Sequence, residues 1–360
     1  MIAKKNLVAA AALMVVAAAA QADVKLYGTL DYYAGSVEVA HTKGTSSRTT
    51  EVGSGGMMTS FIGFAGSEDL GGGLKAEFTL ESFLAGDTGK TLANNYGGFW
   101  GRASNVALSG GFGKVAIGQY DNPLFTSGYT YNPFGSSMVV SPTMRHLGYL
   151  GQTGITGAGV GFDTGWVNSL TYESPIFSGL QAFAQYAPKE STTAGTKNSY
   201  TLAAQYNAGP FSAMLTYVNG GKSDSSCATK TTTGTSPNYG YCGYTANEKV
   251  TDLGASYDFG VAKGFAQFTS IKDDTNSNKD TIYQVGVSAP LSDKATVMAS
   301  YGSLRNKVNN GGAKTTDKVF SVGYDYTLSK RTDVYGAFMT NSQTSLESGQ
   351  TVVVGIKHNF

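Results

Sequence analysis

Histidine, cysteine and carboxylate side chains are the groups in this sequence that could carry out chemistry, and their spacing argues against an active site. The three histidines, His41, His146 and His358, are far apart in the chain of 360 residues, and none belongs to a recognisable Ser-His-Asp or metal-ligand motif. The many Gly-Gly pairs lack the pattern of a phosphate-binding loop. We therefore predict no enzymatic activity, no catalytic residue, no metal and no cofactor, with the histidines in surface or interfacial positions.

The two cysteines have a different kind of chemistry open to them. Cys227 and Cys242 both lie in a long polar stretch, residues 219–248, between two hydrophobic segments. Two nearby thiols in an oxidising compartment are expected to pair. A bond between them would close a ring of about 16 residues, worth ~3 kcal/mol in the chain-entropy model. We predict a disulfide that rigidifies this loop without stabilising the rest of the fold.

The charge balance and composition restrict the class of protein. The chain has 26 basic and 25 acidic side chains, so it offers no large positive field to a nucleic acid, and we predict no nucleic-acid partner. Charged residues make up 14% of the chain, well below the ~25% of an ordinary soluble domain. The 48 glycines, together with abundant Tyr and Phe, favour strands and turns over helices. The composition indicates an all-β protein, either soluble or in an outer membrane.

The N-terminus has the pattern of an export signal. Lys4 and Lys5 precede an apolar run from Leu7 to Ala20, and the small-x-small sequence Ala20-Gln21-Ala22 follows. The apolar run is too short to span a bilayer as a helix, which needs ~20 residues. We predict a signal peptide at residues 1–22, cleaved before Asp23, and one domain at residues 23–360.

The rest of the chain repeats a unit of about ten residues with alternating polarity. In the segment 318–328, Phe320, Val322 and Tyr324 alternate with Ser321 and Gly323, which places the two sets on opposite faces of one strand. Strands are predicted at 24–35, 58–68, 73–84, 99–109, 113–120, 166–174, 180–188, 198–207, 211–219, 249–259, 264–272, 280–290, 295–305, 318–328, 332–341 and 350–360. In the segment 332–341 the phase is ambiguous, because Tyr335 and Met339 oppose Val334 and Phe338.

Alternation alone does not separate a membrane barrel from a soluble sandwich, but three further features favour the barrel. The polar faces hold small polar residues and isolated charges, as a wet lumen would, and aromatic residues gather at the ends of the apolar faces. Short and long connections alternate along the chain. The number of segments is even, so an antiparallel closure satisfies every backbone group in lipid. We predict a sixteen-stranded antiparallel transmembrane β-barrel whose apolar face meets lipid and whose opposite face encloses solvent.

Four stretches resemble the general porins of Gram-negative bacteria, in particular the trimeric sixteen-stranded porins of the neisserial and burkholderial type. They are Leu26-Tyr27-Gly28-Thr29-Leu30-Asp31, Gly66-Ser67-Glu68-Asp69-Leu70-Gly71-Gly72-Gly73-Leu74-Lys75-Ala76, Gly110-Gly111-Phe112-Gly113 and Val354-Gly355-Ile356-Lys357-His358-Asn359-Phe360. The resemblance implies a multi-pass protein of the outer membrane, in contact with its lipid, that assembles as a homotrimer of water-filled pores. It implies passive diffusion of ions and small hydrophilic solutes.

The third long loop, residues 121–165, resembles the loop of this family that folds into the barrel and narrows it. Such a loop inside a compact fold is usually functional. The residues that the resemblance places at the constriction are Asp121, Asn132, Pro133, Phe134, Gly135 and Arg145 on the loop, and Asp31, Lys75, Glu77, Glu81, Arg102 and Lys357 as inward candidates on the barrel.

The chain departs from the family pattern at several cationic positions. Phe61 and Ala65 stand where relatives tend to have Arg and Lys, and Gly118-Gln119-Tyr120 lacks the Arg that often precedes the third loop. We therefore expect weak ion selectivity that leans to cations or neutral solutes.

Two other functions remain open at this point. Phe125, Tyr129, Tyr131 and Phe134 could form a stacking surface that makes the pore prefer a sugar or an aromatic acid, or they could be the packing core of the loop itself. A secreted β-sandwich adhesin would share the alternation, but it would be soluble without detergent, and it does not explain the terminal Phe360 or the rhythm of the loops.

Overall fold

The structure is a computed structural model, and it describes residues 23–91, 98–148, 165–190, 192, 195–221, 248–273, 278–307 and 314–360. Among these residues, no helix is both long enough and apolar enough to cross a membrane. Cys227, Cys242 and the predicted signal peptide lie outside the described residues, so both predictions stay predictions.

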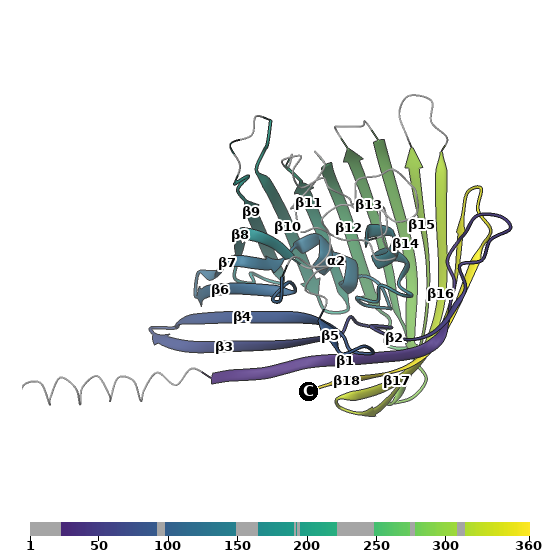
Figure 1. The fold of residues 1–360 in the computed structure, drawn as a ribbon. Coiled ribbons are helices and arrows are strands. Elements are labelled where there is room, and N and C mark those ends of the chain that lie inside the picture. The colour runs from purple at the N-terminus through teal and green to yellow at the C-terminus, as the bar shows by residue number, and fades with distance from the viewer. Residues whose placement is uncertain are drawn as a thin grey trace, which may run out of the picture.

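The described chain forms one antiparallel sheet that closes on itself (Figure 1). Of its eighteen strands, β2 (Thr49–Ser54) and β5 (Lys90–Thr91) are short additions, and the other sixteen form the barrel. The barrel strands are β1 (Asp23–Val37), β3 (Phe61–Gly71), β4 (Leu74–Ala85), β6 (Ala103–Gly110), β7 (Gly113–Asp121), β8 (Gly165–Glu173), β9 (Leu180–Ala187), β10 (Ser199–Ala208), β11 (Phe211–Asn219), β12 (Glu248–Asp258), β13 (Lys263–Asp273), β14 (Asn278–Pro290), β15 (Ala295–Lys307), β16 (Thr315–Ser329), β17 (Thr332–Gln343) and β18 (Gly349–Asn359). The predicted fold is confirmed, with strand ends that move by a few residues.

The barrel closes where the first strand meets the last. In β1, Thr29 to Ser36 pair with Asn359 to Val352 of β18, and Gly28 and Phe360 exchange backbone hydrogen bonds at 3.1 and 3.2 Å. The first half of β1 pairs with β3 and its second half with β2, so one strand has partners along both edges. Closure gives the first and last strands a partner each, whereas an unpaired edge could not be tolerated in hydrocarbon.

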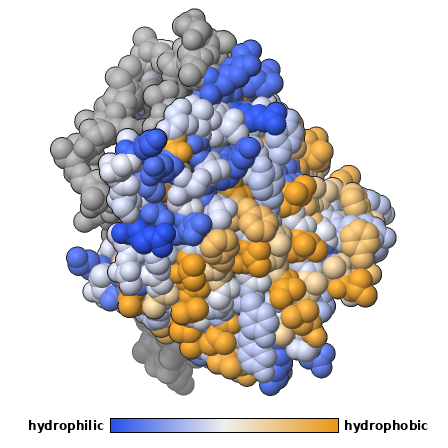
Figure 2. All heavy atoms as spheres, turned by 90° about the vertical axis from the view of Figure 1, so that its right-hand side faces the viewer, coloured by the Kyte–Doolittle hydropathy of each residue, from blue (hydrophilic) through white to orange (hydrophobic). Residues whose placement is uncertain are grey.

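The alternation of side chains follows the prediction. Phe320 and Val322 are each 41% exposed on the outer face of β16, whereas Ser321 between them is fully buried inside. In β17, Phe338 faces outward and Met339 is fully buried, which settles the ambiguous phase of that strand. Figure 2 shows the outward apolar side chains gathered in the lower part of one face, with hydrophilic side chains above them.

Tight turns join strand pairs at one end of the barrel. Between β3 and β4, Gly71, Gly72 and Gly73 have φ values of +84°, +63° and +80°, a region that residues with a Cβ rarely adopt. The sequence therefore encodes this turn in three consecutive glycines. The strand β2 was not predicted; its Thr-rich segment extends the sheet because the second half of β1 offers it a free edge.

The third loop enters the barrel and carries two helices, α2 (Pro123–Thr130) and α3 (Pro142–Gly148). Helix α2 begins at the Asn122 cap, whose Oδ1 accepts the Leu124 N–H at 2.9 Å, and Pro123 takes the first helical position. The inner faces of β11 to β15 meet these helices with apolar side chains: Val218, Val250, Ile271, Ile282 and Leu304. At these five positions the inward face of the barrel meets the third loop and not solvent, because the loop helices need apolar partners there.

Candidate pore constriction

The turn at Asn132 to Gly135 is held by hydrogen bonds within the third loop. The Asn132 side-chain amide donates to the Gly135 carbonyl at 2.9 Å and to the Gly128 carbonyl, and Oδ1 accepts the Phe134 N–H at 2.8 Å. Gly135 has a φ of +52°. Asn132 thus organises the turn that Pro133 and Phe134 present to the barrel wall.

Four inward glycines of the wall receive the third loop. A Cβ built on Gly286 of β14 would lie 2.6 Å from Pro133 Cδ, and one on Gly323 of β16 would lie 2.8 Å from Phe134 Cε1. Gly302 of β15 stands in the same relation to Pro142 at 2.6 Å, and Gly254 of β12 faces the Tyr131 ring. Sequence reasoning missed this set, although each glycine occupies an inward position of an alternating strand.

Two buried carboxylates anchor the loop to the wall. Asp252 of β12 accepts hydrogen bonds from Ser127 of α2 at 2.5 Å and from Thr269 of β13 at 2.6 Å. Asp317 of β16 lies 2.9 Å from His146 Nε2 on α3. The expectation of a surface or interfacial position for His146 is wrong, because its side chain is 3% exposed between the loop and the wall. Paired in this way, the two carboxylates fix one helix each.

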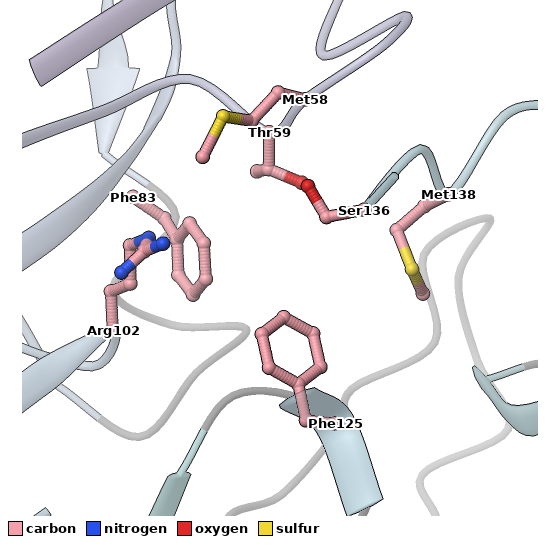
Figure 3. A pocket seen from close by; sticks show the side chains of 7 residues that line it. All are labelled: Met58, Thr59, Phe83, Arg102, Phe125, Ser136 and Met138. Atoms are coloured by element: carbon pink, nitrogen blue, oxygen red, sulfur yellow. The ribbon is translucent and has the colours of Figure 1, made fainter. Parts of the chain in front are cut away.

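The open side of the loop faces a gap between the loop and the wall (Figure 3). We call it the constriction gap and define it by its lining residues: Met58 and Thr59 from the segment 55–60, Phe83 and Arg102 from the wall, and Phe125, Ser136 and Met138 from the third loop. Figure 3 shows these side chains approaching a common space from opposite sides.

Charges on the adjoining wall occur as pairs. The Arg102 Nη1 atom donates to Glu81, which also accepts the Tyr27 hydroxyl, and the guanidinium stacks 4.2 Å from the Phe61 ring centroid. Lys114, which was not predicted, bonds Glu77 at 2.7 Å. The phase of Lys114 in its strand is the signal that could have found it. These pairs leave little net charge on this part of the wall.

Two other predicted site residues, Asp31 and Lys357, do not line the constriction gap. Asp31 is fully buried, with its Oδ2 accepting the N–H groups of Met57 and Met58 at 2.8 Å each and its Oδ1 accepting the Tyr335 hydroxyl at 2.5 Å. It therefore holds the 55–60 segment in place. Lys357 lies 3.3 Å from Asp333 near the turn end of the barrel.

The remaining three charged candidates are also placed. Lys75 is exposed at the start of β4, opposite Ser109 of β6 and close to the glycine turn, so it lies away from the gap. Arg145 is 6% exposed in α3 and donates to the Val139 carbonyl at 3.1 Å. Asp121 is half-buried at the end of β7.

The aromatic residues of the loop mostly serve its own packing. Tyr131 and Phe134 are buried against the wall, and Phe125 packs edge-on to Tyr129 with centroids 5.3 Å apart. Burial raises the pKa of the Tyr129 phenol, and the nearby charge of Asp121 raises it further, so this side chain is neutral. Phe125 alone of the four belongs to the lining of the constriction gap.

Comparison with known proteins gives consistent results over the whole chain. A family profile described as Gram-negative porin matches residues 9–345. The outer membrane porin protein 32 of Delftia acidovorans is 32% identical over 99% of this chain and 100% of its own length. An outer membrane porin protein of Bordetella pertussis is 28% identical over the same shares. The solved anion-selective porin from Comamonas acidovorans is 29% identical with a TM-score of 0.73, covering 94% of this chain and 100% of that one.

Proposed function

Because this chain belongs to the Gram-negative porin family, we propose that the constriction gap is the narrowest part of its pore and sorts solutes by size, with weak charge selectivity. The protein is a multi-pass channel of the Gram-negative outer membrane through which ions and small hydrophilic solutes diffuse passively. The alternative of a soluble β-sandwich adhesin is set aside. No catalytic step is part of this proposal.

One observation carries the proposal: the third loop is fixed to one arc of the wall, and cation–carboxylate pairs lie on the opposite arc, along which we expect solute to pass. Arg102 is paired with Glu81, and Lys114 with Glu77. A paired arrangement produces a local dipole with little net charge, so it does not favour one ion sign strongly. The Comamonas relative is named for anion selectivity, and we expect this chain to be less anion-selective than that protein.

Reversal potentials across a planar bilayer in a KCl gradient test the proposal. Near 0.1 M salt the Debye length is ~10 Å, so charges at the gap are felt by passing ions. We expect a small reversal potential for the unmodified channel, a shift toward cation selectivity for Arg102→Gln and a shift toward anion selectivity for Glu81→Gln. Arg305→Gln, at an exposed position on the outer face of β15, is the control and should leave the potential unchanged. Strong anion selectivity of the unmodified channel would refute the charge-balance argument.

We further propose that the protein is a homotrimer, as the family resemblance implies. Large apolar side chains are exposed on the first and last strands, among them Leu26 on β1 at 56% and Val354 on β18 at 61%. Three copies could bury these faces against one another without polar cost. Light scattering with size-exclusion chromatography in detergent should give the mass of three chains, and a monomer of full channel activity would contradict the assignment.

A further inference from the structure

The constriction gap has an uneven chemical lining that a purely size-selective opening does not require. Two phenyl rings and two thioethers, from Phe83, Phe125, Met58 and Met138, make up most of it, and Arg102 is the one ionisable side chain among the described residues that line it. We infer that the gap is a weak binding site for aromatic monocarboxylates, which rests on the proposed function in that the gap must be the narrowest part of the pore.

The apolar part of the lining is suited to a flat ring. In Figure 3, Phe83 on β4 lies at the left of the gap and Phe125 on α2 lies below it, with the thioether side chains of Met58 above Phe83 and of Met138 at the right. Aromatic rings pack favourably against other rings and against thioether sulfur. A sugar presents hydroxyl groups around most of its ring and would leave them without partners at such a surface.

Arg102 supplies the partner for a carboxylate. Among the described residues, its guanidinium makes its side-chain hydrogen bond through Nη1, to Glu81, so that the Nε and Nη2 hydrogens remain available. Stacking on Phe61, with the Phe83 ring centroid 5.7 Å away on another side, fixes the plane of the group. An oriented guanidinium binds a carboxylate through two parallel hydrogen bonds.

The same ion pair limits the strength of binding. Glu81 offsets most of the charge of Arg102, so a carboxylate gains hydrogen bonds and ring contacts but little long-range attraction. Solutes in a channel must be held loosely enough to leave. A weak, shape-dependent site therefore agrees with transport, and it predicts retention that depends on the ring as well as on the charge.

The site is held in place before any solute arrives. Asp31 fixes the 55–60 segment, which carries Met58 and Thr59, through two backbone hydrogen bonds. Ser137 of the third loop donates to the Gly56 carbonyl at 2.7 Å, which ties the loop to that segment across the gap. Preorganisation lowers the entropy lost on binding.

Partial block of single-channel current tests the inference. Sodium benzoate, sodium acetate, benzyl alcohol and glucose are added in turn to channels conducting KCl in a planar bilayer. We expect benzoate to reduce the current at a concentration at least ~10-fold lower than each of the other three, equivalent to ~1.4 kcal/mol. Equal block by benzoate and acetate, or stronger block by glucose, would overturn the inference.

Two variants assign the effect to the two halves of the site. Arg102→Gln should abolish the preference for benzoate over benzyl alcohol, and Met138→Gln, which keeps the length of the side chain, should abolish the preference for benzoate over acetate. Arg305→Gln is the matched control, and benzoate should block this variant as it blocks the unmodified channel. If Arg102→Gln does not fold, Met138→Gln decides alone, and unchanged benzoate block in that variant refutes the site.

The outcome distinguishes this inference from the proposed function. A channel with graded size exclusion in KCl that shows no preferential benzoate block keeps its assignment as a general pore and loses the binding site. A channel whose conductance is unaffected by either substitution in the gap loses both, because the gap is then not its narrowest part.

Discussion

Adding a single methyl group to the wall behind the third loop should narrow the pore. In Gly286→Ala the new Cβ would lie 2.6 Å from Pro133 Cδ, whereas carbon atoms in contact are ~3.5 Å apart, so the Asn132–Gly135 turn must move by about 0.9 Å. The Pro133 ring is stiff, and β14 is fixed in its sheet by both neighbours. The turn therefore yields toward the lumen, and overpacking of this kind costs about 1–3 kcal/mol.

The measurement is single-channel conductance in KCl, with the ion selectivity recorded on the same channels. We expect Gly286→Ala to conduct less than the unmodified protein at unchanged reversal potential, because the displaced turn carries no charge. Gly323→Ala, whose Cβ would lie 2.8 Å from Phe134 of the same turn, should act in the same direction but less strongly.

Gly336→Ala is the control for this prediction. It lies on β17, and its Cβ would be 3.9 Å from the nearest atoms, which is ordinary contact. The reasoning is refuted if Gly286→Ala conducts like Gly336→Ala, since the loop would then not rest on that glycine.

Three further outcomes are expected. Tyr335→Phe removes one hydrogen bond to the buried Asp31 carboxylate, a contact that contributes about 1.5–3 kcal/mol to stability. The 55–60 segment is then held less firmly, so open-channel noise should increase. Noise equal to that of the unmodified channel would contradict this role. Non-reducing mass spectrometry should find Cys227 bonded to Cys242, and two alkylatable thiols in the intact protein would disprove the bond. The mature protein isolated from membranes should begin at Asp23, which N-terminal sequencing can check.

The barrel could be predicted from the sequence because its rule is local. Each strand alternates apolar residues such as Phe320 on its outer face with small polar residues such as Ser321 on its inner face. This period of two is recognisable within ten residues of sequence. The tight turns are local as well, since Gly71 to Gly73 encode theirs without help from the rest of the chain. The strand β2 was not predicted, because it pairs with the part of β1 that β3 leaves free. That free edge exists only once the sheet has closed.

The constriction could be predicted only in part. The Asn132–Gly135 turn is recognisable because its hydrogen bonds are internal to the loop. The positions that receive it are not, because an inward glycine such as Gly286 looks the same whether it faces water or a proline. Asp252 likewise gives no sign in sequence that its partner is Ser127, 125 residues earlier. Contacts between segments that are distant in sequence can be predicted only when the register of the strands in the closed barrel is known.

The inner wall has two arcs of different composition, and we expect this division to make the pore narrow and yet only weakly charged. From β11 to β17 the third loop rests on inward apolar side chains and glycines, and the buried carboxylates of Asp252 and Asp317 bind it there. The cation–carboxylate pairs of Arg102 and Lys114 lie on the opposite arc, on or beside β4, β6 and β7. We therefore expect packing on one side to set the width of the pore and paired side chains on the other side to set its charge. Because the loop rests on the first arc, a substitution beneath the loop should change the width of the pore. The charges of Arg102, Lys114 and their carboxylate partners on the other arc should stay the same.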